Sequence, residues 1–156
     1  MDLATPVEET QKLIKGFEQG CDVAIGSRAN RREGAPLIRK IQSNGFMIIR
    51  NVLMGTWGIR DTQCGCKGFS RTAALSIIEK MRVFTDRREA SGPSVSAAFD
   101  LEFIFLAQKL GLKILEVPVV WRHAETKRVA FWKDSIETLK DLATMRWYAL
   151  TGKYTF

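Results

Sequence analysis

Residues 61–69 read DTQCGCKGF, which joins an acid, two glycines and a lysine in one short segment. Polar segments that contain glycine form turns and loops between regular elements. Before this segment, apolar residues at helical spacing predict a helix over 37–54 that ends at Gly55. After it, a shorter pattern predicts a helix over 72–80. Residues 61–69 are therefore expected to form a glycine-rich loop between regular elements.

Helices and strands alternate along the rest of the chain. The first helix is expected to have Thr5 as its N-cap, Pro6 in its first position and Glu8 closing a capping box, with Gly20 ending it. Its buried face is expected to consist of Leu13, Ile14 and Phe17. The other predicted elements are strands over 22–27 and 113–121, a loop over 82–96, and helices over 99–110 and 132–150. This alternation indicates one α/β domain over residues 1–156.

The chain is basic, with 24 Lys and Arg against 17 Asp and Glu, a net charge of +7. Between Arg28 and Arg50 the only acid is Glu33. Such a concentration fits nucleic acid, an anionic membrane surface or a phosphate-bearing substrate, and a solvated basic face is an equal alternative. No apolar run approaches the roughly 18 to 20 residues of a membrane span, and no signal peptide is recognisable. We therefore expect a cytoplasmic chain that is either soluble or peripheral to the cytoplasmic face of a membrane.

Four further stretches accompany 61–69 and give the chain a family resemblance. They read DLATP at 2–6, GSR at 26–28, AFDLE at 98–102 and EVPVVW at 116–121. Together they resemble family 2 glycosyltransferases that make polyprenyl-phosphate sugars, especially dolichyl-phosphate glucose synthases. The resemblance implies a GT-A type, Rossmann-like domain with a mixed sheet flanked by helices. It also implies inverting transfer of a hexose from a UDP-sugar to dolichyl or polyprenyl phosphate.

The resemblance further implies that the chain corresponds to the acceptor-side, C-terminal half of such a domain, without the donor-binding half. A half-domain would expose sheet edge and apolar surface. On this interpretation the chain alone is expected to be inactive and to form a homodimer.

Candidate site residues are carried over from the same resemblance. The acceptor phosphate, largely dianionic at neutral pH, would be contacted by cations and a hydroxyl. These residues are Arg28, Arg39, Ser43, Lys67 and Lys127, with Arg50 on the same helical stripe as Arg39. Because an ionised phosphate oxygen is already a nucleophile, the reaction would need no general base and would depend on positioning and electrostatics.

Three acids are the candidate catalytic residues: Asp61, Asp100 and Glu102. Asp61 would orient the glycine-rich loop or touch the sugar, or it would only cap a turn. Asp100 and Glu102 stand two residues apart at a helix start, so they cannot share a helical face, and helix capping is an alternative role for both. Asp2 would ligate Mg²⁺ or Mn²⁺ that bridges the nucleotide diphosphate.

Other interpretations of these residues remain open. The helix over 132–150 is amphipathic and suits a membrane interface, core packing or dimerisation. Cys21, Cys64, Cys66 and His123 could form a zinc site, although C-x-C is tighter than the usual spacing. Residues 65–68, GCKG, match the G-x-x-G loop of KH domains, which would make the chain a nucleic-acid-binding domain. Because a KH loop joins two helices, we expect no nucleic acid partner.

Overall fold

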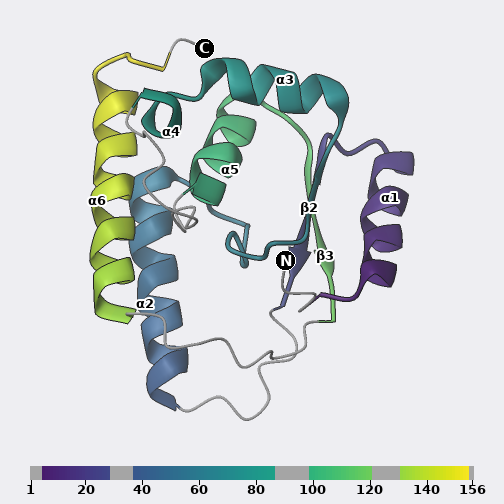
Figure 1. Ribbon diagram of the computed structural model, residues 1–156, viewed down its shortest axis with the longest axis horizontal. Coiled ribbons are helices and arrows are strands. Elements are labelled where there is room, and N and C mark those ends of the chain that lie inside the picture. The colour runs from purple at the N-terminus through teal and green to yellow at the C-terminus, as the bar shows by residue number, and fades with distance from the viewer. Residues whose placement is uncertain (1–4, 29–36, 87–98, 121–130, 155–156) are drawn as a thin grey trace.

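The computed structural model describes residues 5–28, 37–86, 99–120 and 131–154, although the side chains of 37–44, 85–86 and 131–135 are not included. The described elements form a mixed three-stranded sheet with helices on both faces (Figure 1). This arrangement confirms the α/β class that the alternation of helices and strands predicted.

The central strand of the sheet is β1 (Val23–Ser27), which is buried along its whole length. Strand β2 (Lys67–Phe69) pairs antiparallel with it, and β3 (Ile114–Pro118) pairs parallel with its other edge. The predicted 113–121 strand is thus shorter in the structure. The β2 pairing was not predicted, because three residues of a glycine-rich segment carry no strand pattern of their own.

Helix α1 (Thr10–Glu18) covers one face of the sheet. The other face is covered by α5 (Phe99–Lys109), with α2 (Leu37–Met54) and α6 (Phe131–Leu150) packed together beyond it (Figure 1). Helices α3 (Arg71–Lys80) and α4 (Val83–Asp86) lie toward one end of the sheet. Helix α4 lies within residues 82–96, which were predicted to form a loop. That prediction is therefore partly wrong.

Helix ends follow the predicted glycines. Gly20, Gly55 and Gly111 all have positive φ just after α1, α2 and α5, a conformation that side chains with a Cβ rarely adopt. Ser70 is the N-cap of helix α3, and its hydroxyl accepts the backbone N–H of Ala73 at 3.2 Å. The predicted ends of α2 agree with the structure.

The predicted capping box at the first helix is wrong. Pro6 occupies the cap position with an extended backbone and no side-chain cap, and the chain enters through a 3₁₀ turn, η1 (Val7–Glu9). Glu8 is exposed. Ile14 is also exposed, because α1 turns only a narrow stripe toward the sheet, with Leu13 and Gly16 buried and Phe17 partly buried.

The two faces of β1 contribute to two apolar clusters. Val23 and Ile25 point into the larger cluster, which α3, α5 and α6 complete. Ala24 points into the smaller one, with Leu13 of α1, Cys64 and Val119. The site described next lies where β1 ends, at the edge of the smaller cluster.

Candidate functional site

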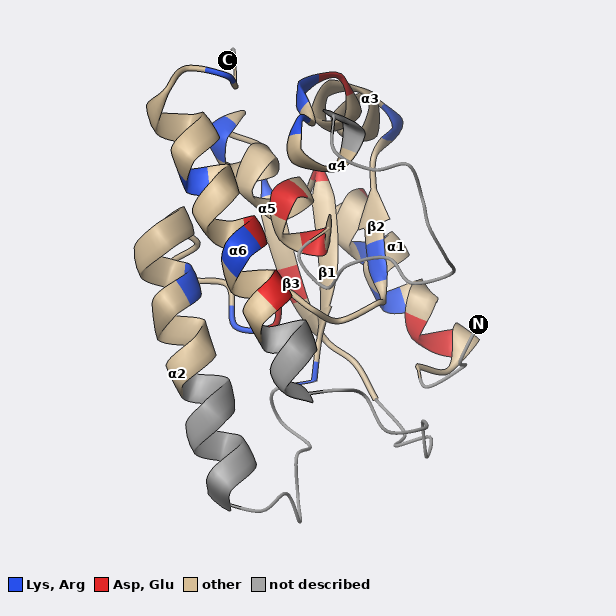
Figure 2. Ribbon diagram, turned by 60° about the vertical axis from the view of Figure 1, so that its left-hand side comes forward, with Lys and Arg blue, Asp and Glu red and all other residues tan. Residues whose placement is uncertain are grey.

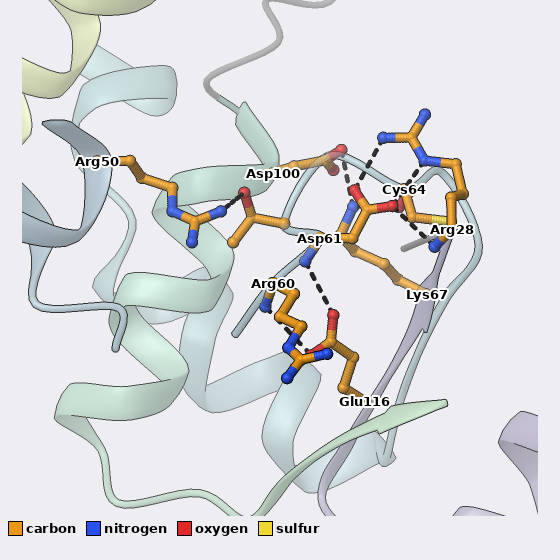
Figure 3. Close-up of polar contacts among 9 residues, drawn as sticks. Arg28, Arg50, Arg60, Asp61, Cys64, Lys67, Asp100 and Glu116 are labelled. Atoms are coloured by element: carbon orange, nitrogen blue, oxygen red, sulfur yellow. Dashed lines mark hydrogen bonds and ion pairs between the residues drawn. The ribbon is translucent and has the colours of Figure 1, made fainter. Parts of the chain in front are cut away.

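Arg28, directly after β1, forms a bidentate ion pair with Asp61 (Figure 3). Its Nε donates to Asp61 Oδ2 at 2.7 Å, its Nη2 donates to Oδ1 at 2.8 Å, and its backbone N–H donates to Oδ2 at 2.9 Å. Asp61 is only 7% exposed, so this pair is largely shielded from water. The hydrogen bond to Asp61 raises the pKa of Arg28, and burial opposes it.

Lys67 and Asp100 form a second ion pair beside the first (Figure 3). Lys67 Nζ lies 2.8 Å from Asp100 Oδ2 and also donates to the carbonyl oxygen of Cys64. The Lys67 side chain is 6% exposed and that of Asp100 is 35% exposed, so the acid forms the outer side of this pair.

The sheet explains why these residues meet. Ile25 of β1 is paired with Lys67 of β2, and because the strands are antiparallel, the end of β1 adjoins the start of β2. Gly26 lies under the glycine-rich loop: a Cβ there would come within 3.0 Å of the Cys66 carbonyl oxygen. The close approach of these two backbones therefore favours glycine at this position.

Two cysteines belong to the same loop. Burial is the largest influence on each and raises the pKa of the Cys64 and Cys66 thiols. Both are free, and a protonated thiol is a poor nucleophile and metal ligand. No group of three or more His, Cys, Asp or Glu in the described part of the chain could hold a metal ion. Cys21, Cys64 and Cys66 therefore form no such group with each other, and His123 lies outside the described residues.

The turn that carries Asp61 is held from two sides. Glu116 of β3 accepts the backbone N–H of Arg60 at 3.1 Å and that of Asp61 at 2.8 Å. From α2, Arg50 donates to the carbonyl oxygen of Ile59 at 2.6 Å and to Thr62 Oγ1 at 2.8 Å. Burial lowers the pKa of Arg50.

Arg50 and Glu116 were not assigned these roles from the sequence. Arg50 was placed on a stripe facing the acceptor phosphate, whereas it is 2% exposed and holds neutral partners. Glu116 was only part of a motif. A signal was available for Glu116, because an acid inside the apolar strand ILEVP requires a polar partner.

Glu102 lies apart from this site, in the main core. It is fully buried and accepts the backbone N–H groups of Arg82, Val83 and Phe84 and the hydroxyl of Tyr154, which lies 2.7 Å from Oε1. Glu102 therefore caps the start of α4 and anchors the chain after α6. Figure 2 shows acidic residues, in red, both on α5 and in strand β3 of the sheet that α5 covers.

The remaining predicted site residues cannot be placed. Asp2 and Lys127 lie outside the described residues. Arg39 and Ser43 lie on α2, but their side chains are not among those described. Four predicted residues thus meet in one cluster, which we call the charged cluster: Arg28, Asp61, Lys67 and Asp100.

The geometry bears on the alternatives from the sequence. Residues 65–68 follow a turn and enter strand β2, whereas a KH loop joins two helices. Among the described residues, no helix combines the length and the apolar character that crossing a bilayer requires.

Comparison with known proteins supports the resemblance to family 2 glycosyltransferases. The chain is 32% identical over 164 residues to dolichyl-phosphate beta-glucosyltransferase of Saccharomyces cerevisiae, 34% over 151 residues to that of Dictyostelium discoideum, and 32% over 164 residues to that of Homo sapiens. The alignments cover 99%, 94% and 98% of this chain but only 43%, 42% and 47% of these relatives. The chain thus spans less than half the length of these relatives. No protein-family model matches it.

Proposed function

We propose that this chain takes part in transferring a hexose, glucose in the first instance, from a UDP-sugar to dolichyl or polyprenyl phosphate with inversion. One observation carries the proposal: residues from three of the stretches that resemble glycosyltransferases meet in the charged cluster. Similarity to dolichyl-phosphate beta-glucosyltransferases over nearly the whole chain supports it.

In this proposal Arg28 and Lys67 bind the acceptor phosphate. Their present partners hold them in place until the phosphate arrives. Asp100 is the more exposed of the two acids, so the phosphate would compete with Asp100 for Lys67 more easily than with Asp61 for Arg28. Arg39, Ser43 and Lys127 would complete the phosphate contacts.

The transfer itself would be a direct displacement. An ionised oxygen of the polyprenyl phosphate forms a bond to the anomeric carbon of the sugar, while the bond from that carbon to the UDP oxygen breaks and UDP leaves. No proton needs to be removed from the acceptor, since its second pKa is about 6. The residues around the phosphate would contribute positioning and charge stabilisation.

Mg²⁺ or Mn²⁺ is the proposed cofactor, and it would neutralise charge on the leaving diphosphate. The three candidate catalytic acids do not fit such an ion, because Asp61 and Asp100 are each paired with a cation and Glu102 is buried in the core. The resemblance assigns the ion to Asp2. The charged cluster is therefore proposed as the acceptor side of the reaction, with no step through the metal.

Two binding partners complete the proposal. Exposed apolar residues lie along α6 and α2, and they are Ile136, Leu139, Trp147, Leu150, Ile48, Ile49 and Val52. They would contact the cytoplasmic face of a membrane, or a second copy of the chain in a homodimer. Co-sedimentation with anionic liposomes at low and high salt tests the first, and light scattering tests the second.

Thermal unfolding with added ligands tests the proposed function. A short-chain polyprenyl phosphate should raise the Tm, because a ligand at 100 times its Kd stabilises by about 2.7 kcal/mol. Lys67→Met should reduce this shift, and Lys80→Met on α3 is the matched control, which should leave it unchanged. RNA should have no effect. Stabilisation by RNA but not by polyprenyl phosphate would refute the proposal.

A transfer assay tests the reaction itself. The chain is incubated with radiolabelled UDP-glucose, dolichyl phosphate and Mn²⁺, and the label is followed into the lipid phase. We expect no label in the lipid phase from this chain alone, and label there would overturn the expectation that it is inactive without a donor-binding half. If the chain binds the acceptor but transfers no label, its part in the reaction is acceptor binding.

A further inference from the structure

We propose that Glu116, together with Arg50, positions the Asp61 carboxylate so that it holds Arg28 at the end of β1. This inference rests on the proposed function only for its consequence, acceptor binding. The arrangement itself is read from the hydrogen bonds around the turn 59–62.

The turn 59–62 belongs to no helix or strand, yet each of its residues is held by a side chain from elsewhere. Arg50 donates to the carbonyl oxygen of Ile59 and to the hydroxyl of Thr62, at the two ends of the turn. Glu116 accepts the two backbone N–H groups between them, those of Arg60 and Asp61. A segment without regular structure is therefore held by four hydrogen bonds from two side chains.

Arg50 is itself oriented by a neighbour. Its Nε and Nη2 donate to Asn51 Oδ1 at 3.2 and 2.7 Å, and Thr56 Oγ1 lies 3.0 Å from the same oxygen. This network is buried, so its hydrogen bonds are not exchanged for bonds to water. It connects α2 to the turn independently of the sheet.

Glu116 connects the turn to the sheet. It is paired with Ile25 in the parallel register of β3 and β1, and Ser27 at the end of β1 is paired with Pro118. The carboxylate of Glu116 thus starts from the same strand pair that places Arg28. Glu116 fixes the turn relative to β1, and Arg28 directly follows β1. The Asp61 carboxylate therefore lies within hydrogen-bonding distance of both the guanidinium and the backbone N–H of Arg28.

The hydrogen-bond partners of Glu116 support a positioning role for it. Its two oxygens are used by backbone N–H groups, which keep the carboxylate in one orientation. Asp61, in contrast, receives a guanidinium. Two acids thus have distinct roles: Glu116 fixes the backbone, and Asp61 fixes Arg28.

Amide hydrogen exchange measured by NMR tests this inference without any activity. In Glu116→Ala the amides of Arg60 and Asp61 should exchange at least about tenfold faster, since their acceptor is gone. The decisive amide is that of Arg28, which Glu116 does not contact. It should also exchange about tenfold faster, because its acceptor is Asp61. The Val23 amide, which donates to Lys113, reports overall unfolding and should be unchanged.

Two further variants complete the exchange experiment. Glu116→Gln retains one acceptor oxygen and should give intermediate exchange at Arg28, whereas a purely steric role would be retained in full by Gln, which has nearly the same shape as Glu. Glu79→Gln, at an exposed position of α3, is the matched control and should behave as the unaltered chain. If Glu116→Ala unfolds the chain, as faster exchange at Val23 would show, the Gln variant decides. Unchanged exchange at Arg28 beside faster exchange at Arg60 and Asp61 would overturn the inference.

The functional consequence is measured separately, as the Kd for a short-chain polyprenyl phosphate. Glu116→Ala should weaken binding about tenfold, and Glu116→Gln should weaken it less. If the unaltered chain does not bind this ligand, the proposed function fails while the exchange result still decides the positioning role. If it binds and Glu116→Ala binds equally well, the positioning role has no part in acceptor binding, and the inference fails in this respect.

Discussion

Asp61 and Glu102 carry the same chemical group and came from the same family resemblance, yet the structure places them in different surroundings. Asp61 lies at the end of β1 and holds a guanidinium. Glu102 lies in the main core and accepts three backbone N–H groups and a phenol hydroxyl. Asp61 accepts one backbone N–H and two bonds from a guanidinium, and that charged side chain can exchange the carboxylate for a ligand. The backbone partners of Glu102 cannot leave without unfolding the segment that carries them. Motif membership therefore did not decide which role an acid has.

Helix geometry explains the difference between Glu102 and its neighbour Asp100. Residues of a helix are about 100° apart around its axis, so positions i and i+2 face in nearly opposite directions. Asp100 consequently reaches Lys67 in the charged cluster, and Glu102 points into the core. The expectation that these two acids do not share a helical face is confirmed.

Replacing Glu102 should have the largest effect on stability. Glu102→Ala leaves three backbone N–H groups and the Tyr154 hydroxyl without their acceptor, and we expect a loss of about 3 to 5 kcal/mol in the free energy of unfolding. Urea unfolding followed by circular dichroism measures it. Glu102→Gln, which retains one acceptor oxygen, should cost less. A loss below about 1 kcal/mol for the Ala variant would contradict the core role.

Breaking the Arg28 and Asp61 pair should cost less, because Arg28 is partly exposed and water screens the charge that is left behind. For Asp61→Ala we expect a loss of about 1 to 3 kcal/mol in the free energy of unfolding. A double-mutant cycle with Arg28→Ala isolates the pair. Additive effects of the two substitutions would show that the pair contributes nothing.

The core cluster around Glu102 should also make the chain sensitive to alkali. Burial, with the Glu102 carboxylate beside it, raises the pKa of Tyr154. The unfolded chain therefore loses this proton from about pH 10 upward, while the folded chain keeps it. The free energy of unfolding should be unaffected by this group below pH 10 and should then fall by up to about 1.4 kcal/mol per pH unit. Tyr154→Phe should remove this fall. If the variant and the unaltered chain have the same pH profile, Tyr154 is not the cause of the alkaline sensitivity.

Asp100 should give the smallest effect of the four. Its side chain is 35% exposed, so Asp100→Asn should change the free energy of unfolding by less than about 1 kcal/mol. In the proposed function, the same change releases Lys67 and should strengthen binding of a short-chain polyprenyl phosphate. Calorimetric titration compares the two chains. Weaker binding by the variant would show that Asp100 assists the phosphate instead of competing with it.

The sequence by itself determined the elements that carry their own local signals. Apolar spacing together with Gly55 determined α2 (Leu37–Met54), and Gly20 and Gly111 marked two other helix ends, because a positive φ is inexpensive only for glycine. The run 22–27 identified the central strand from its β-branched residues. The stretches that resemble glycosyltransferases identified Arg28, Asp61, Lys67 and Asp100, which the structure then brought together.

Only the tertiary structure decided the contacts between segments far apart in the sequence. Lys67 is in a strand because β1 offers it a partner, and Ile14 is exposed because only a narrow stripe of α1 meets the sheet. Arg50 is 9 and 12 residues away from its partners in the turn, and Glu116 is 55 and 56 residues away from its own. Such contacts depend on how strands pair and helices pack, and no local pattern encodes them. The different roles of Asp61 and Glu102 were likewise decided by strand pairing and helix packing.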